Sequence, residues 1–377
     1  LSITSNDYNY KIYRDLGQYY NFKHNYNDAI KYLSKALSLA EKLSDVKYIA
    51  PILGKIGLAE YDIGNLDKAL EKFNEELKLF KKIKDCIGQA LAEGHIGMVL
   101  FQKGDLNEAY IQFKNQYDTS KLNDSRKMII QSLGNMALIH NIQGNYDKSF
   151  KIYEEILSIA YDIYDLRSQA QTYGNLGIIY KNLSDFEKAH ANYRKQLKIS
   201  LKIGDEFQES NSYDGIAIVY HKIGDYKNSI KFHNKAITIE KKINDKNGLA
   251  SSYCNLSLTY FENNNIKEAK NNLNKGLKIF KDIGNQRAVE IGNYEMSKYL
   301  QFEKKLNLAI KKLDSPIIFF EKINDNIYLI KSLIQLGKLQ ILIKNNDSIT
   351  SLQKALKISE KIEHNDFIDQ IKKILDK

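Results

Sequence analysis

The feature that most constrains the fold is a pattern of residues that recurs every 40 positions. Each copy has a large apolar residue followed by a small one, then a second small residue, then a bulky one, as in Leu176-Gly177, Ala189 and Tyr193. The large–small pairs are Leu16-Gly17, Ile56-Gly57, Ile96-Gly97, Met136-Ala137, Leu176-Gly177, Ile216-Ala217, Leu256-Ser257, Met296-Ser297 and Leu336-Gly337. No insertion or deletion interrupts the first eight copies, which indicates a repeat architecture.

Each copy has the residue spacing of two helices joined by a tight turn. An aromatic residue follows the small one after three positions, as in Gly177 and Tyr180, and this spacing places both on one helical face. Between the two segments stands Gly-Asn or Gly-Asp, as in Gly224-Asp225. Glycine ends one helix in the left-handed conformation, and Asp or Asn accepts from the free N–H groups that begin the next. Because the 377 residues include only 2 prolines, which break helix interiors, we predict an all-α fold without strands.

One helix pair cannot bury its apolar face alone, so neighbouring pairs must stack into a solenoid. No Gly-, Ser- or Pro-rich linker divides the chain, and we expect a single array over residues 1–377. The expected repeats cover about 7–45, 46–85, 86–125, 126–165, 166–205, 206–245, 246–285, 286–325 and 326–363, followed by a capping helix at 364–377.

The pattern weakens in the eighth copy. It lacks the turn glycine, having Glu303-Lys304-Lys305 instead, and Pro316 falls inside its second helix. Because proline removes a backbone hydrogen bond and clashes with the preceding turn, we predict a kink or an early helix end there.

The segment Gly174–Tyr180, with Asp185–Ala189 after it, resembles the tetratricopeptide repeat (TPR) in its 40-residue form. The resemblance covers about residues 7–363. Similar arrays occur in Leu-Gly-Asn-type adaptors, kinesin light chains and Rap-type bacterial peptide receptors. The resemblance implies a right-handed superhelix of about nine helix-turn-helix repeats that binds a protein or an extended peptide in its concave groove.

The residues of catalytic and metal sites are not assembled in any known motif. Cys86 and Cys254 match no disulfide or zinc spacing, and the histidines form no HxxxH or HExxH pair. No phosphate-binding glycine loop or nucleophile elbow is present either. We therefore expect no enzyme activity, no metal and no cofactor, and free thiols in a reducing, cytoplasmic compartment. No run of about 20 apolar residues predicts a membrane span.

The chain carries 56 basic and 46 acidic residues, a formal charge of +10. This excess favours an acidic partner through long-range attraction that salt screens. Only five of the basic residues are arginine, which bidentate phosphate and base recognition prefers, so nucleic-acid binding is the weaker hypothesis.

Two positions on the first helix of each copy are expected to face the groove: the residue before the large–small pair, and the residue one turn earlier. In the central copies these hold Asn and Gln, whose amides both donate and accept and can therefore bind a peptide backbone. The sixth copy departs from this with Gly215, beside which Asp214 can substitute. The predicted groove residues are Gln131, Asn135, Gln171, Asn175, Asn211, Asp214 and Asn255. The alternative is that these amides bond neighbouring helices. A carboxylate clamp of the chaperone-binding kind needs several basic groove residues, and at the position before the large–small pair we find only the isolated Lys55.

The main hypothesis is a non-catalytic scaffold or adaptor that holds a protein or peptide. The chain begins with Leu1 rather than methionine, which keeps open a sensor or regulatory array within a larger signalling protein. Self-association through the C-terminal repeats also stays open.

Overall fold

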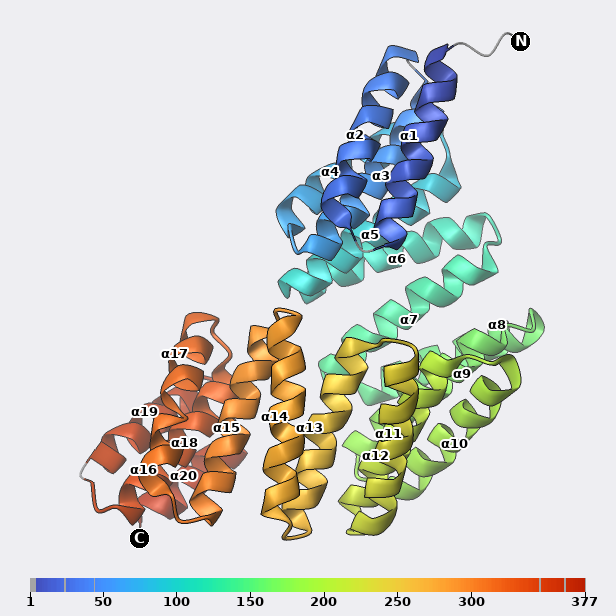
Figure 1. Cartoon of the computed structure of the whole chain (residues 1–377). Coiled ribbons are helices and arrows are strands. Elements are labelled where there is room, and N and C mark those ends of the chain that lie inside the picture. Colours follow the sequence, from blue (N-terminus) through green and yellow to red (C-terminus); the bar gives the residue numbers. More distant parts are fainter. Residues whose placement is uncertain (1–4, 24, 44, 346, 363, 377) are drawn as a thin grey trace. The chain divides into compact units, whose positions relative to one another are not determined.

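A computed structural model of the chain describes residues 5–23, 25–43, 45–345, 347–362 and 364–376; Leu1 lies outside these ranges. Within them the chain forms 20 helices joined by short turns, and no strand (Figure 1). The helices are α1 (Ser5–Phe22), α2 (Tyr26–Leu43), α3 (Val46–Ile63), α4 (Leu66–Ile83), α5 (Cys86–Lys103), α6 (Leu106–Leu122), α7 (Arg126–Ile142), α8 (Tyr146–Asp162), α9 (Leu166–Asn182), α10 (Phe186–Ile203), α11 (Glu206–Lys222), α12 (Tyr226–Lys242), α13 (Lys246–Glu262), α14 (Ile266–Asp282), α15 (Gln286–Phe302), α16 (Leu306–Lys311), α17 (Asp314–Lys322), α18 (Asn326–Leu342), α19 (Asp347–Lys361) and α20 (Asn365–Leu375). The predicted all-α repeat fold is confirmed.

The helices follow one another in pairs that match the repeats of the sequence. A first helix packs against the second helix of its own pair, and that second helix packs against the next first helix, as α11, α12 and α13 do. First helices of adjacent pairs also touch, as α11 touches α13 and α15 touches α18. The pairs therefore stack in the manner of a TPR solenoid.

The chain divides into two compact units, unit 1 (Leu1–Thr172) and unit 2 (Tyr173–Lys377), with the boundary inside α9. Each unit has a core of its own. Phe73 packs with Ile96 in unit 1, and Tyr193 packs with Ile216 in unit 2. A single array over the whole chain stays a prediction.

The recurring small residues lie where two helices of a pair approach closely. At Gly177 on α9, a Cβ atom would lie 2.7 Å from Cε1 of Tyr193 on α10, a distance that carbon atoms do not tolerate. Ala189, one turn before Tyr193, is fully buried. The small and bulky residues of the sequence pattern are thus the two sides of one contact.

The turns use the predicted chemistry, with one addition. Gly224 has a φ of 81°, and the next residue, Asp225, accepts a hydrogen bond at 3.0 Å from the backbone N–H of Asn228. Repeats without a glycine place another residue in the same left-handed conformation, such as Ser184 and Lys304, each with a φ of 60°. The turn is therefore conserved in shape where its glycine is lost.

The second helix of the eighth repeat is broken, as predicted from Pro316. Helix α16 ends at Lys311 and α17 begins at Asp314. Proline has no N–H to donate to the carbonyl of Lys312, four residues earlier, so the helix is interrupted at that turn. After the ninth repeat, α20 packs against α18 and α19 and buries Ile371, as expected of a capping helix.

Candidate binding face of the first helices

The predicted groove residues all lie on first helices. Gln131 and Asn135 are on α7 and Gln171 is on α9, within unit 1; Asn175 on α9, Asn211 and Asp214 on α11 and Asn255 on α13 are within unit 2. On each of α7, α9 and α11 the predicted groove residue that comes earlier in the helix is exposed, namely Gln131, Gln171 and Asn211. The other four residues are half-buried. Side chains on this face are therefore accessible, but not all of them are free.

Asn135 and Asn175 form no side-chain hydrogen bond with any described residue. Asn255 behaves differently, because its Nδ2 donates to Oδ2 of Asp214 at 3.1 Å. That bond joins first helices of neighbouring repeats, α13 and α11. For Asn255 the structure therefore matches the alternative in which the amide bonds a neighbouring helix.

Asp214 is the centre of a polar network inside unit 2. Its Oδ1 lies 2.8 Å from Nδ1 of His233 on α12, and it accepts from Oγ of Ser252 on α13 at 3.4 Å. Ser252 also donates to Glu240 at 2.8 Å. The network thus connects both helices of the sixth repeat to the first helix of the seventh.

The inner members of this network are almost completely buried. His233 is 1% exposed and Glu240 is 2% exposed. Burial, assisted by the charge of Asp214, raises the pKa of Glu240 to about 7, although the hydrogen bond from Ser252 opposes this. Burial also lowers the pKa of the nearby Lys181 ammonium, against the attraction of Asp214. Nε2 of His233 and Oε2 of Glu240 have no hydrogen-bond partner within the described ranges.

Asp214 has room because the residue opposite it on the second helix is smaller than in the second to fifth repeats. In those four repeats the position of Asp214 is glycine, and in two of them the glycine faces a glutamine side chain. A Cβ at Gly94 would lie 2.5 Å from Nε2 of Gln116, and one at Gly174 would lie 2.6 Å from Nε2 of Gln196. In the sixth repeat the position of those glutamines is held by Ala236, which leaves space for the carboxylate.

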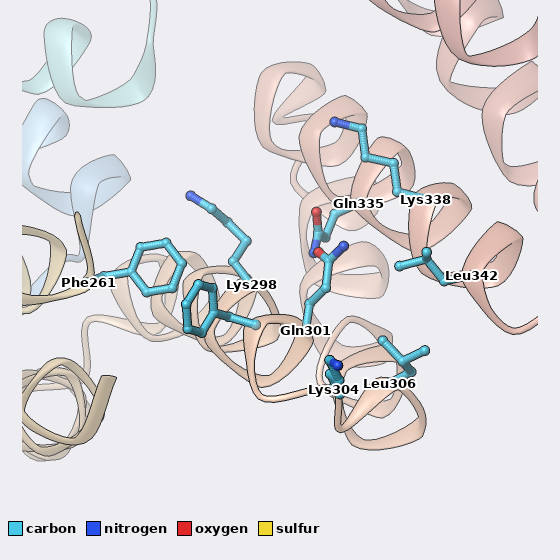
Figure 2. Close-up of a pocket in the computed structure, with 9 residues that line it drawn as sticks. Phe261, Lys298, Gln301, Lys304, Leu306, Gln335, Lys338 and Leu342 are labelled. Atoms are coloured by element: carbon cyan, nitrogen blue, oxygen red, sulfur yellow. The ribbon is translucent and has the colours of Figure 1, made fainter. Parts of the chain in front are cut away.

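A pocket of about 650 Å³ lies farther along the first helices of unit 2 (Figure 2). We call it the lysine pocket. It is lined by Phe261 of α13, by Lys298, Gln301 and Phe302 of α15, by Lys304 in the turn after α15, by Leu306 of α16, and by Gln335, Lys338 and Leu342 of α18. In Figure 2 the Gln301 and Gln335 side chains meet between α15 and α18, where Nε2 of Gln335 donates to Oε1 of Gln301 at 2.7 Å.

The sequence prediction missed the lysine pocket, because it considered only two positions of each first helix. Lys298 and Lys338 stand two residues after the large apolar residue of their copies. The same position is apolar in the six preceding copies, with Leu58, Met98, Leu138, Ile178, Ile218 and Leu258. This change from apolar to basic, repeated once at the 40-residue spacing, was the signal that could have identified the pocket.

Other site types are not found among the described residues. No group of three or more His, Cys, Asp or Glu side chains there is placed to hold a metal ion. None of the helices in this part of the chain combines the length and the apolar character needed to cross a membrane. Cys86 and Cys254 are both free cysteines.

Known proteins share the repeat and the fold. A family model for the tetratricopeptide repeat matches residues 9–82, 128–202 and 208–282, which is more than half of the chain. No curated protein matches the chain.

Many solved structures resemble the chain, and three of them illustrate the likeness. The apo form of the quorum sensor NprR from B. thuringiensis is 17% identical, with a TM-score of 0.61 over 85% of this chain and 86% of that one. The Rap conjugation gene regulator of the plasmid pLS20, in complex with the Phr* peptide, is 19% identical, with a TM-score of 0.52 over 72% of this chain and 75% of that one. A signal transduction ATPase with a tetratricopeptide repeat sensor, from Pyrococcus horikoshii, is 18% identical, with a TM-score of 0.61 over 93% of this chain and 54% of that one.

At these identities the likeness concerns the fold. The resemblance to Rap-type arrays that the sequence predicted is confirmed at that level. With the repeat matched over most of the helix pairs, the chain belongs to the tetratricopeptide repeat family.

Proposed function

We propose that this chain is a non-catalytic scaffold or adaptor that holds a protein or an extended peptide on the face of its first helices. The observation that supports this most directly is the placement of Gln131, Asn135, Gln171 and Asn175. These carboxamides are exposed or half-buried at repeating positions, and those of Asn135 and Asn175 have no hydrogen-bond partner within the described ranges. An amide can donate to and accept from a peptide backbone whatever the side chains of that peptide are.

The structural relatives support the same proposal. One of them is a regulator solved in complex with a peptide, and another is a quorum sensor. We place the protein in a reducing, cytoplasmic compartment, with an acidic ligand as the favoured partner because of the charge of +10.

A second candidate is a sensor array that belongs to a larger signalling protein. The ATPase from Pyrococcus horikoshii favours it, because the array of that protein is named as a sensor and this chain covers 54% of it. The two candidates share the binding step and differ in what the binding controls.

The experiment is selection of displayed random peptides on the purified chain, followed by measurement of their dissociation constants by fluorescence anisotropy. Loss of two backbone-binding amides in Gln131→Ala/Asn135→Ala, both on α7 within unit 1, should weaken binding about tenfold or more. The matched control is Asn115→Ala, at an exposed position on the second helix α6. Failure to select any saturable peptide would reject the proposed function, and equal binding by both variants would move the site away from these amides.

A further inference from the structure

We propose that the lysine pocket takes an acidic side chain of an extended peptide together with a large apolar side chain next to it. This rests on the proposed function and adds to it the chemistry of one ligand position. Three properties of the pocket support it: an uncompensated positive charge, an exposed aromatic wall and its place at the end of an apolar row.

The charge of the pocket is positive and only partly neutralised. Lys298 pairs with Glu295 on the same helix, with Nζ and Oε2 2.7 Å apart. Lys304 and Lys338 form no ion pair with any residue that the structure describes. Two of the three lysines that line the pocket therefore have no acidic partner among the described residues and can attract a carboxylate. The hydrogen bond from Gln335 to Gln301 uses the Oε1 atom of Gln301, so the amide N–H groups of Gln301 stay available for an anion.

The wall beside these lysines is apolar and unusually accessible. Phe302 is 56% exposed and Leu342 is 55% exposed. The ring of Phe302 stands edge-on to the ring of Phe261, with 5.8 Å between their centroids. A ligand that offered only a carboxylate would leave this surface in water, whereas a neighbouring large apolar side chain would cover it.

The pocket also ends a row of equivalent positions within unit 2. Ile178, Ile218 and Leu258 precede Lys298 and Lys338 in this row, and Ile178 is 38% exposed. Within this unit α11 contacts α13 and α15 contacts α18, and the members of the row recur every 40 residues, so they follow one another along the face of the first helices. A peptide lying on that face would meet apolar positions first and the two lysines last.

The pocket fits an acidic side chain better than a nucleic acid. Its lining contains no arginine, and its largest exposed groups are Phe302 and Leu342 rather than a track of cations. It is lined by three first helices in turn, α13, α15 and α18, so an extended chain that crosses them passes over the pocket. We therefore assign the carboxylate to a side chain within the peptide.

The test uses four pools of fluorescein-labelled, N-acetylated octapeptides with random flanks. Three are C-terminally amidated and fix a central Glu-Phe, Gln-Phe or Glu-Ser pair, and the fourth is the Gln-Phe pool with a free carboxylate. Anisotropy is measured near physiological salt. The Glu-Phe pool should bind about tenfold tighter than either the Gln-Phe or the Glu-Ser pool, because each of these lacks one of the two contacts.

The variants separate charge from apolar contact. Lys338→Gln should abolish the preference for Glu over Gln, and Phe302→Ser should abolish the preference for Phe over Ser. Lys357→Gln is the matched control, because it removes the same charge from an exposed position on the second helix α19. It should leave both preferences unchanged.

Three results would overturn the assignment while the proposed function stands: equal binding of the Glu-Phe and Gln-Phe pools, equal losses in Lys338→Gln and Lys357→Gln, or tight binding only by the free-carboxylate pool. Tighter binding of a labelled single-stranded oligonucleotide than of any peptide pool would overturn it in favour of phosphate. If no pool binds the parent chain and displayed peptides also fail, the proposed function itself is rejected.

Discussion

Asp214 and His233 form a partly buried contact of 2.8 Å between Oδ1 and Nδ1 that joins the two helices of the sixth repeat. In the fifth repeat the same two positions hold Gly174 and Tyr193. The sixth repeat therefore has a titratable pair at positions where the fifth has a glycine and a tyrosine. Such a pair is sensitive to the loss of Asp214, because the buried His233 then stays desolvated without this hydrogen bond.

We accordingly expect Asp214→Ala to lower the free energy of unfolding by about 2 to 3 kcal/mol. The substitution leaves Nδ1 of His233 and Nδ2 of Asn255 without their acceptor. Urea unfolding monitored by circular dichroism measures the change.

The control for this prediction rebuilds the fifth repeat inside the sixth. A quadruple variant with Asp214→Gly, Ala217→Gly, His233→Tyr and Ala236→Gln copies Gly174, Gly177, Tyr193 and Gln196, and it should stay within about 1.5 kcal/mol of the parent. A quadruple variant as unstable as Asp214→Ala would show that the cost comes from something other than the broken pair.

Glu240 predicts a pH dependence of stability. Its pKa is raised to about 7 in the folded chain, whereas an unfolded glutamate titrates near 4.3. Between these values the folded state holds the extra proton, so stability falls as pH rises from about 4.5 to 7. The loss should reach about 3 to 4 kcal/mol, since each unit of pKa difference corresponds to about 1.4 kcal/mol. Thermal unfolding at several pH values measures it, and Glu240→Gln should remove this part of the decline.

Histidines change the stability with pH in the opposite direction to Glu240. The comparison with Glu240→Gln is therefore needed to isolate the contribution of Glu240. Burial lowers the pKa values of His140, His190 and His221, so their contribution to stability rises with pH up to about 6.5. If the parent chain and Glu240→Gln have the same pH profile, Glu240 is not protonated in the folded state.

Two glycines within first helices should respond oppositely to alanine. At Gly177 the added Cβ meets the ring of Tyr193 at 2.7 Å, and we expect a loss of about 1 to 3 kcal/mol. At Gly134 nothing lies within 4 Å of the added Cβ, so Gly134→Ala should gain up to about 1 kcal/mol from helix propensity. Urea unfolding of the two variants in parallel tests this, and a loss at both positions would contradict it.

The turns between helices give a further pair of variants. Ser184 holds a φ of 60°, so Ser184→Gly should be neutral or stabilising by up to about 1 kcal/mol. Gly224 holds a φ of 81°, so Gly224→Ala should cost about 1 kcal/mol. Melting temperatures of both variants measure the difference, and a stabilised Gly224→Ala would contradict the assigned turn.

The sequence was sufficient for the fold because the repeat pattern encodes contacts that are local to one helix pair. Gly177 and Tyr193 are 16 positions apart, and the same spacing separates the small and the bulky residue in each of the first eight copies. The break near Pro316 was predictable for the same reason, since it depends on one backbone hydrogen bond four residues earlier.

The candidate site was predictable only in part. The accessible positions of Asn135 and Asn175 on first helices follow from helix periodicity, but the bond between Asn255 and Asp214 depends on the distance between α13 and α11. The lysine pocket depends on side chains from several first helices, and on the exposure of Phe302, which no single repeat encodes. Geometry of this kind arises between copies and is not contained in the pattern of any one copy.

In the fifth and sixth helix pairs the two facing positions have complementary sizes: Gly174 faces Gln196, and Asp214 stands opposite Ala236. This limits which helices of the chain can be combined with one another. A first helix fits only a second helix whose side chain has the complementary bulk. If α11 were paired with α10, the carboxylate of Asp214 would enter the space that Gln196 fills beside Gly174. Single helices therefore cannot be duplicated, deleted or transplanted without their partner. A transplanted pair must in turn fit its neighbour, since a Cβ at Gly215 of α11 would lie 2.6 Å from Cδ1 of Tyr193 on α10.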